Sequence, residues 1–302
     1  MKNKILLLIV VVLSVIAISG SKKETTYFNN DKKEEVKEEI KLALKDTSTG
    51  EIKNIELEDY IVGVVAGEMP ASFNEEALKA QAIASRTYAM YKIKNSNGTY
   101  DLVTDKTNQV YITEDKMKNL WQENFDYYFE KIKKAVYDTK DLIMTYNGNV
   151  ILSMYFARSN GKTEDAISVF GSNEEYLKSV DSPEESLTSE ITIGKDEFCN
   201  KLSISCNTIN ISNVLKSKTG RINSLNINGR TFKGTEIRTL FDLKSTDFDI
   251  IIDSEIKFVT KGYGHGVGMS QYGANKLAQD GKNYEEILKH YYQNINIEKI
   301  SV

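Results

Sequence analysis

Residues 63–76, with the sequence GVVAGEMPASFNEE, join two segments that have the pattern of helices. Before this stretch, an apolar stripe over residues 57–66 predicts a helix that ends just ahead of a proline. After it, Ser72 and Glu75 have the spacing of a capping box, so a second helix is expected from there to about Lys92. The second helix is rich in alanine, which lets neighbouring elements approach it closely.

Elements on either side of this helical pair mix strands and helices. Residues 40–44 and 52–57 alternate apolar and polar side chains around a Ser-Thr-Gly turn, which is the pattern of a hairpin. A longer helix is expected over residues 115–137. The remaining predicted elements are strands over residues 142–156 (with a hairpin turn at Asn147-Gly148), 222–227, 248–252 and 255–260, and helices over residues 269–279 and 284–292. We therefore expect an α+β fold, with helices and antiparallel strands mixed in one bilobed body over residues 40–302.

The first residues have the composition of an export segment. Lys2 and Lys4 precede an apolar run over residues 5–19, which is slightly short for a membrane-spanning helix and long for the core of a signal peptide. We expect residues 1–21 to be either a cleaved signal or a retained anchor. Both interpretations place the rest of the chain outside the membrane. Residues 22–39, rich in Lys, Glu and Asp, are expected to be a charged tether.

The composition excludes several classes of partner. The chain has 302 residues, of which 40% are hydrophobic and 27% charged, and its formal net charge is −4. These fractions suit a folded protein, and the lack of a basic excess argues against binding nucleic acid through phosphate. Cys199, Cys206, His265 and His290 are too scattered for a structural zinc site. The two cysteines either pair in an oxidising compartment or are small buried apolar residues.

Glu68 is the first candidate for chemistry. It stands where an apolar helix ends, just before Pro70, and a carboxyl group in such surroundings is expected to have a raised pKa. It would then hold a proton near neutral pH and donate it to a substrate. The alternative is a solvated glutamate that pairs with a cation. No second acid stands out, so the sequence does not indicate a two-carboxylate glycosidase.

A glycine-rich stretch, residues 261–274, is the second candidate. Its sequence, KGYGHGVGMSQYGA, matches neither of the common phosphate-binding patterns. Glycines let a backbone come close to a ligand, and His265, Ser270 and Gln271 are polar groups beside that backbone. We interpret the stretch as the wall of a binding site, with a tight turn and a structural histidine as the alternative. Ser270 lacks the GxSxG pattern of a serine nucleophile.

Five blocks of sequence, taken in order, resemble the stage II sporulation protein D (SpoIID) family. The blocks are residues 63–73, 76–89, 155–164, 176–183 and the glycine-rich stretch that ends at Ala274. The resemblance spans residues 40–297. It implies a membrane-tethered lytic transglycosylase that cleaves MurNAc–GlcNAc bonds in peptidoglycan strands freed of stem peptides and leaves 1,6-anhydroMurNAc ends. Glu68 matches the catalytic acid of the family's Glu-Met-Pro motif.

The resemblance also implies cofactors, partners and a location. One carboxyl group suffices, because the C6 hydroxyl of the muramic acid itself attacks C1, so no cofactor is expected. Some relatives bind zinc near the segment that matches residues 108–111, which here contains neither Cys nor His, and we expect no metal. The expected partners are the amidase stage II sporulation protein P and, in the membrane, stage II sporulation protein M. The catalytic domain would lie outside the cytoplasm, on the mother-cell side of the septum, and act in wall remodelling during engulfment.

The residues expected to bind substrate are Arg86, Ser159, His265, Ser270 and Gln271. We interpret Arg86 as reaching the cleft from the alanine-rich helix, with a buried structural pair as the alternative. Residues 157–159 read Ala-Arg-Ser where relatives show Ser-Thr-Ser, which removes two hydroxyls and adds a cation. Tyr263 stands where many relatives have Trp.

Two other functions stay open on the sequence alone. One is a non-catalytic modifier that binds glycan or an amidase, because related domains serve as enhancers of cell-wall amidases. The other is a hydrolytic muramidase, which would release reducing ends in place of anhydro ends. The muramidase and the lytic transglycosylase are distinguished by product mass, because the anhydro product of the transglycosylase is one water lighter.

Overall fold

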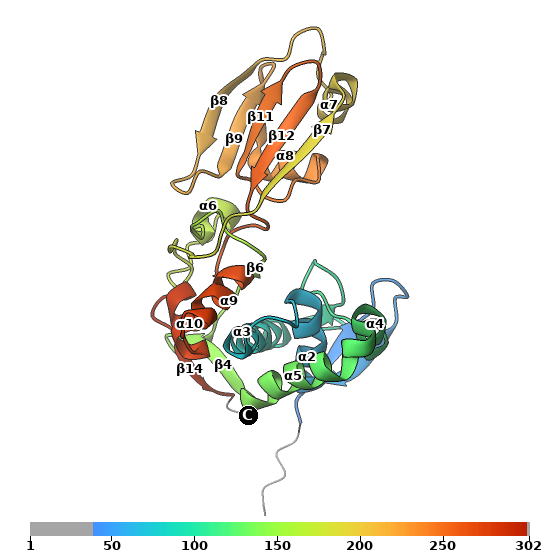
Figure 1. Cartoon of the computed structure of the whole chain (residues 1–302), viewed down its shortest axis with the longest axis vertical. Coiled ribbons are helices and arrows are strands. Elements are labelled where there is room, and N and C mark those ends of the chain that lie inside the picture. Colours follow the sequence, from blue (N-terminus) through green and yellow to red (C-terminus); the bar gives the residue numbers. More distant parts are fainter. Residues whose placement is uncertain (1–38, 301–302) are drawn as a thin grey trace, which may run out of the picture. The chain divides into compact units, whose positions relative to one another are not determined.

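Helices α2 (Leu57–Glu68) and α3 (Glu75–Lys94) lie in the larger of two hydrophobic cores (Figure 1). The structure is a computed structural model that describes residues 39–300. The predicted signal or anchor segment, residues 1–21, lies outside the described residues, and so does the predicted tether over residues 22–39 except for its last residue. The two helices confirm the pair expected around the Glu-Met-Pro stretch.

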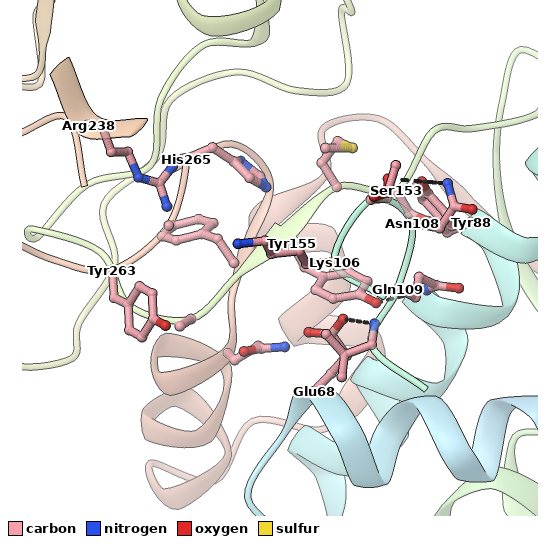
Figure 2. Close-up of a pocket in the computed structure, with 17 residues that line it drawn as sticks. Glu68, Tyr88, Lys106, Asn108, Gln109, Ser153, Tyr155, Arg238, Tyr263 and His265 are labelled. Atoms are coloured by element: carbon pink, nitrogen blue, oxygen red, sulfur yellow. Dashed lines mark hydrogen bonds between the residues drawn. The ribbon is translucent and has the colours of Figure 1, made fainter. Parts of the chain in front are cut away.

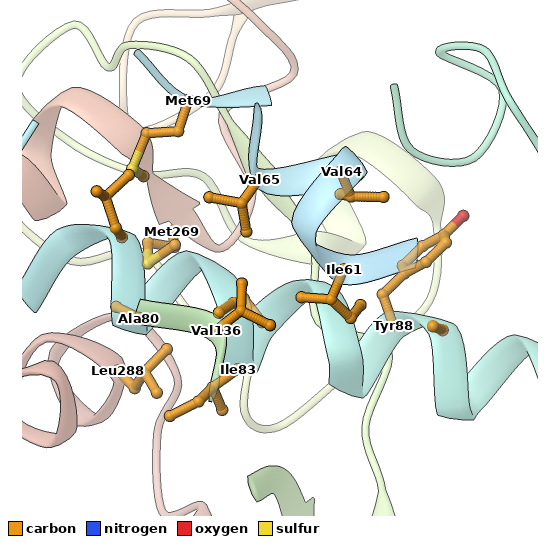
Figure 3. Close-up of a cluster of buried hydrophobic side chains, with 14 of the residues drawn as sticks. Ile61, Val64, Val65, Met69, Ala80, Ile83, Tyr88, Val136, Met269 and Leu288 are labelled. Carbon is orange, nitrogen blue, oxygen red and sulfur yellow. The ribbon is translucent and has the colours of Figure 1, made fainter. Parts of the chain in front are cut away.

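The junction between α2 and α3 differs from the prediction in its cap. Asn74, not Ser72, is the N-cap of α3, and its side chain accepts a 3.0 Å hydrogen bond from the amide of Glu76. Figure 3 shows Val65 of α2 and Ile83 of α3 in one buried cluster. The alanines of α3 add little bulk, so α2, α5 and the C-terminal helices can all pack against it.

The predicted N-terminal hairpin is confirmed. Strands β1 (Lys41–Lys45) and β2 (Ile52–Glu56) pair antiparallel, with Leu42 opposite Ile55. Strand β3 (Leu102–Val103) lies on the other side of β1 and pairs with it in parallel. The expectation of purely antiparallel strands is therefore wrong at this sheet.

The helix predicted over residues 115–137 is broken into two. Its parts are α4 (Glu114–Trp121), a 3-10 turn (Gln122–Asn124) and α5 (Phe125–Asp138). The break falls at Gln122, whose φ of 46° lies in the left-handed region and cannot continue a right-handed helix. Helix α5 packs against α2 and α3 through the fully buried Ile132 and Val136.

A small sheet and two helices close the same core. The turn predicted at Asn147-Gly148 joins β4 (Leu142–Tyr146) to β5 (Asn149–Val150), and β14 (Asn296–Lys299) pairs with the other edge of β4. Helices α9 (Gln271–Gln279) and α10 (Tyr284–Tyr291) both pack on α3.

One short parallel pairing brings distant segments together. Strand β6 (Tyr155–Phe156) pairs with β13 (Met269–Ser270), which lies inside the glycine-rich stretch. This pairing sets the glycine-rich stretch beside the chain that follows β5, and it is a second exception to the antiparallel prediction.

The second hydrophobic core lies within residues 188–261. Two three-stranded antiparallel sheets contribute to it, in the orders β10-β9-β8 and β11-β12-β7. Their strands are β7 (Thr188–Ile193), β8 (Ile211–Lys216), β9 (Ile222–Ile227), β10 (Arg230–Lys233), β11 (Phe248–Ile252) and β12 (Ile256–Lys261). The associated helices are α7 (Lys195–Leu202) and α8 (Gly234–Leu240), and the short α6 (Ala166–Phe170) precedes them in the chain. Cys199 and Cys206 form a disulfide, which decides between the two alternatives for the cysteines.

The mixed α+β class is confirmed. Strands β9 and β11 have the predicted bounds, whereas β7, β8, β10, α7 and α8 were not predicted. Within residues 39–300, no helix combines the length and the apolar character needed to cross a membrane.

Candidate active site

A cavity of about 460 Å³ lies at the C-terminal end of α2 (Figure 2). Its wall is formed by Glu68, Tyr88, residues 106–110, residues 153–157, Arg238, residues 263–265 and Gln271. Two features of the fold explain this assembly. The parallel pairing of β6 with β13 brings residues 153–157 beside the glycine-rich stretch that contains residues 263–265 and Gln271. Helix α2 carries Glu68 in its last turn, facing the loop of residues 106–110.

The carboxyl group of Glu68 is held by a hydrogen bond from the loop. Oε1 accepts a bond of 2.7 Å from the backbone amide of Val110, and the side chain of Gln271, which donates to Gln81 at 3.4 Å, lies close enough to lower the pKa of the carboxyl group. Burial raises the pKa of Glu68 above its ordinary value, and the bond from Val110 and the nearby amide of Gln271 offset only part of that rise. The direction agrees with the sequence prediction of a raised pKa.

Two glycines of α2 explain how the loop comes so close. A Cβ at Gly67 would lie 2.5 Å from the carbonyl oxygen of Val110, and one at Gly63 would lie 2.2 Å from the ring of Tyr111. The amide of Ile112 donates a 3.2 Å hydrogen bond to the carbonyl of Gly63. Because the glycines are four residues apart, they share one face of the helix, and the loop docks on that face.

A buried amide fixes the same loop from the other side. The side chain of Gln109 accepts a hydrogen bond from the hydroxyl of Tyr60 at 3.1 Å and donates to the hydroxyl of Tyr155 at 2.8 Å and to the carbonyl of Ser85 at 3.3 Å. Burial raises the pKa of Tyr60 and of Tyr155 well above 10, so both phenols stay neutral. The network positions the loop that carries the amide of Val110.

His265 lines the cavity as a neutral group. Its Nδ1 accepts a 3.1 Å hydrogen bond from the amide of Val267, which leaves the ring proton on Nε2. Burial, with smaller contributions from the charges of Arg238 and Arg221, lowers the pKa of His265 to about 4. At neutral pH the imidazole can therefore offer a hydrogen bond but no positive charge.

The glycines around His265 serve close packing against the chain near β6. A Cβ at Gly268 would lie 1.9 Å from the carbonyl oxygen of Met154, and one at Gly264 would lie 2.7 Å from the side chain of Phe156. Both glycines have positive φ values, of 77° and 115°. The glycine-rich stretch therefore contributes to the cavity wall, and its glycines allow close packing on the chain around β6. Contact of this wall with a ligand stays a prediction.

Ser159 and Ser270 do not line the cavity. Both are fully buried, and both bond to the carboxylate of Glu184: the amide of Ser159 donates at 2.7 Å, and the hydroxyl of Ser270 donates to the same oxygen. Ser182 donates to the other oxygen at 2.6 Å. The predicted contact of the two serines with substrate is corrected. The hydroxyl of Ser270 is bonded to a carboxylate, the hydroxyl of Ser159 accepts a 3.0 Å bond from the amide of Gly161, and both hold the structure together.

Arg86 does not line the cavity either. Its Nε and Nη2 donate to the two oxygens of Glu58 at 2.8 and 2.6 Å, and its other bonds go to the carbonyls of Val136 and Leu142. The side chain is fully buried. The prediction that Arg86 reaches the cleft is wrong, and the alternative of a structural pair describes the geometry. His265 and Gln271 do lie in the wall, and their contact with substrate stays a prediction.

Sequence reasoning missed several residues of the wall. Lys106 and Gln109 lie in a loop without a periodic pattern, and residues 108–111 stand out in the sequence only as the segment that matches a zinc-binding stretch of some relatives. Arg238 lies on α8, where no motif marks it. Within residues 39–300, no group of three or more His, Cys, Asp or Glu side chains is arranged to hold a metal ion, and a metal-free reaction stays a prediction.

An exposed aromatic ring stands at the edge of the cavity. Tyr263 is 43% exposed, and the ammonium of Lys244 lies 4.8 Å from the centre of its ring. The backbones of Tyr263 and Arg158 exchange two hydrogen bonds, of 2.7 and 2.9 Å. The guanidinium of Arg158 lies 3.6 Å from the centre of the Tyr272 ring and outside the cavity wall.

Comparison with known proteins gives the chain a family. The family model described as "SpoIID: Stage II sporulation protein" matches residues 45–146. Stage II sporulation protein D of Bacillus subtilis (strain 168) is 37% identical over 271 residues, which cover 85% of this chain and 79% of the relative. The chain belongs to the SpoIID family. The protein of the same name from Bacillus amyloliquefaciens is 38% identical over 263 residues, covering 83% of this chain and 76% of that relative.

A more distant SpoIID relative carries a different name. The amidase enhancer of Bacillus subtilis (strain 168) is 30% identical over 292 residues, which cover 76% of this chain and 39% of the relative. The matched residues 45–146 include Glu68 and the loop that holds it. The family resemblance inferred from the sequence blocks is therefore confirmed.

Proposed function

We propose that the chain is a lytic transglycosylase that cleaves MurNAc–GlcNAc bonds in peptidoglycan strands freed of stem peptides. The observation that carries the proposal is the carboxyl group of Glu68. It is the one acidic side chain among the described residues that line the cavity, and burial raises its pKa. A single carboxyl group with a raised pKa suits a reaction that needs one acid and no second carboxylate.

The geometry of Glu68 assigns a role to each oxygen. The amide of Val110 donates to Oε1, which supports a proton on the other oxygen, so in the proposed reaction Oε2 carries the acid proton. In the proposed reaction this proton passes to the glycosidic oxygen as the bond from C1 to that oxygen breaks. The C6 hydroxyl oxygen of the same muramic acid then bonds to C1, and its proton returns to Glu68. The products are a 1,6-anhydroMurNAc end and a free hydroxyl on the departing sugar.

Tyr263 gives the cavity a surface for sugar. An exposed ring beside a polar cavity can pack against the apolar face of a pyranose, while His265 and Gln271 supply hydrogen bonds. The neutral phenols of Tyr88 and Tyr155 add further polar groups to the wall.

The proposed location and partners follow from the substrate. Strands without stem peptides are the product of an amidase, so we propose stage II sporulation protein P as the enzyme that prepares them and stage II sporulation protein M as a membrane partner. The apolar run at residues 5–19 supports a catalytic unit tethered outside the cytoplasm during engulfment.

The test is an analysis of products. Amidase-treated glycan strands are incubated with the full chain in detergent, and the fragments are identified by mass spectrometry. Fragments that end in anhydroMurNAc are expected. Fragments one water heavier would instead identify a hydrolytic muramidase.

A second candidate function is favoured by the similarity to an amidase enhancer. Under this alternative the chain cleaves nothing by itself and raises the rate of an amidase on intact peptidoglycan. Intact strands incubated with amidase alone, with the chain alone and with both would separate the two functions. Release of anhydro ends by the chain alone supports the transglycosylase, and an effect seen only on stem-peptide release supports the modifier.

A further inference from the structure

Arg238 is a cation on the cavity wall that lacks an acidic partner. Its Nε donates to the carbonyl of Leu243 at 3.2 Å, and within residues 39–300 neither Nη1 nor Nη2 has a hydrogen bond and no carboxylate oxygen lies within 4.0 Å. The contrast with Arg86 is direct, because Arg86 is paired with Glu58 through two bonds. A half-buried guanidinium with two unengaged nitrogens is suited to bind an anion from outside the chain.

Arg238 and His265 also line a second cavity, of about 440 Å³. The two cavities thus meet at these two side chains, which Figure 2 shows near each other at the end of the first cavity away from Glu68. Arg221 and Lys233 line the second cavity as well. Its one acid, Glu164, is engaged by the hydroxyls of Ser217 and Thr219.

Apolar side chains complete this second wall. Phe170 is 48% exposed and Ile167 is 53% exposed, and both lie on α6. The ring of Phe170 meets the ring of His265 edge to face, with centroids 5.5 Å apart. The region beyond Arg238 therefore combines positive charge with exposed apolar surface, which suits an acidic sugar better than a neutral one.

We propose that Arg238 binds the lactyl carboxylate of a muramic acid residue in the bound glycan strand. This inference rests on the proposed function. In peptidoglycan that bears stem peptides, the lactyl group is an amide, and removal of the peptide exposes it as a carboxylate. A guanidinium presents parallel N–H donors to two carboxylate oxygens, whereas an amide offers one oxygen and turns an N–H toward the same donors.

Arg238 is accordingly a specificity-determining residue. It makes the enzyme favour strands already processed by an amidase, without taking part in bond cleavage. Lys106, also on the wall of the first cavity, is exposed and flexible, so it adds general attraction for anions but not the paired geometry.

The experiment compares two forms of one substrate. Amidase-treated strands carry free lactyl carboxylates, and a portion of them is coupled to methylamine with a carbodiimide, which converts the carboxylates to amides. The full chain in detergent is expected to cleave the carboxylate strands with a kcat/KM about 10- to 100-fold higher than the amide strands, the range for hydrogen bonds to a charged group. Arg238→Gln should lower the value for carboxylate strands far more than that for amide strands, so that the preference is lost. Arg238→Lys should restore only part of the preference.

The matched control is Arg230→Gln. Arg230 lies on the neighbouring strand β10, is exposed, and lines neither cavity. Its loss removes the same charge and should leave the preference intact. Equal loss of activity on both strands in Arg238→Gln, or an unchanged preference, would overturn the role of Arg238.

A binding measurement separates this inference from the proposed function. Glu68→Gln protein, with and without Arg238→Gln, is titrated with each form of the strand. A preference for carboxylate strands that depends on Arg238 supports the inference even where the wild-type chain releases no anhydro ends, a result that would overturn only the lyase. Cleavage by the wild-type chain with equal binding of both strands would overturn only the role of Arg238.

Discussion

The backbone amide of Val110 donates a 2.7 Å hydrogen bond to Oε1 of Glu68, across 42 residues of sequence. The bond ties the last turn of α2 to the loop that forms one wall of the cavity. It also orients the carboxyl group, and in the proposed reaction the other oxygen carries the acid proton. Burial and this bond act in opposite directions on the pKa of Glu68, and burial is the larger effect.

Replacement of Glu68 by glutamine should abolish cleavage of stripped strands. Glutamine retains the shape of the side chain and can still accept the bond from Val110, but it cannot donate and recover a proton. Loss of a general acid lowers kcat by about 10²–10⁴-fold. The release of anhydro ends measures the effect, with Glu56→Gln, an exposed residue before the same helix, as the matched control.

Thermal unfolding shows that the variant is folded. A carboxyl group with a raised pKa stabilises the fold while it is protonated and loses that contribution as the pH rises through the raised pKa. At neutral pH, Glu68→Gln should therefore melt no lower than the wild type. Wild-type turnover by a folded Glu68→Gln protein would contradict the assignment of the acid.

The prediction for Glu68 was possible because local sequence determines its surroundings. The position of Glu68 and its shielding from water are determined by an apolar helix, a proline and the cap of the following helix. The partner at Val110 could not be predicted, because it depends on a loop that docks on two glycines of α2. The glycines were visible in the sequence, but their neighbour in space was not.

The predictions for Arg86 and the two serines failed for a related reason. A polar residue in a strong motif can serve either the site or the fold, and local sequence does not distinguish these roles. Burial distinguishes them: Arg86 needed Glu58 one helix away, and Ser159 and Ser270 needed Glu184. Arg238 was missed because it enters the cavity from the second core, where no sequence block marks it.

The pH dependence of kcat/KM should move when Gln271 is replaced. In the proposed reaction the acid form of Glu68 is the active one, so activity should fall as the pH rises through its pKa. The nearby amide of Gln271 lowers that pKa, so Gln271→Leu should raise it and shift the falling limb to higher pH. Nearby Tyr60, Tyr88 and Tyr155 have raised pKa values and do not titrate in this range.

The control for this profile is Gln279→Leu, at the exposed end of the same helix α9. It should leave the falling limb in place. If the falling limb of the pH profile is unchanged in Gln271→Leu, or moves to lower pH, then Gln271 does not lower the pKa of Glu68.

Arg86→Lys should affect stability and not catalysis. Lysine keeps the charge but cannot serve both oxygens of Glu58 and two carbonyls, and lost charged hydrogen bonds cost about 1.5–3 kcal/mol of unfolding free energy. Denaturant unfolding measures this loss, and kcat/KM at a temperature where the variant is folded should be unchanged. Glu114→Gln, which breaks an exposed pair with Lys118, should leave the unfolding free energy almost unchanged. A reduced kcat with unchanged stability would contradict the structural role of Arg86 and support a role in the cleft.

Reduction of the disulfide should loosen the second core. Cys199 and Cys206 are 7 residues apart, and closing so short a loop is worth about 2 kcal/mol. Cys199 packs with the buried Phe198, so the effect should fall on this core. The melting temperature of the wild type should drop when a reductant is added. A Cys199→Ala/Cys206→Ala variant should have the lower melting temperature both with and without reductant. Equal melting of the wild type in both conditions would contradict a formed disulfide.

Gly67→Ala should impair the enzyme through the loop and not through the helix. Alanine is the better helix former, but its Cβ would lie 2.5 Å from the carbonyl of Val110, so the loop must move and its amide must leave Glu68. Without that bond the pKa of Glu68 rises further, because the amide favours the carboxylate. We expect a kcat below that of the wild type and a falling limb at higher pH. Gly194→Ala, where a Cβ meets open space, should change neither. Wild-type kcat and pH profile in Gly67→Ala would show that the bond from Val110 does not govern the acid.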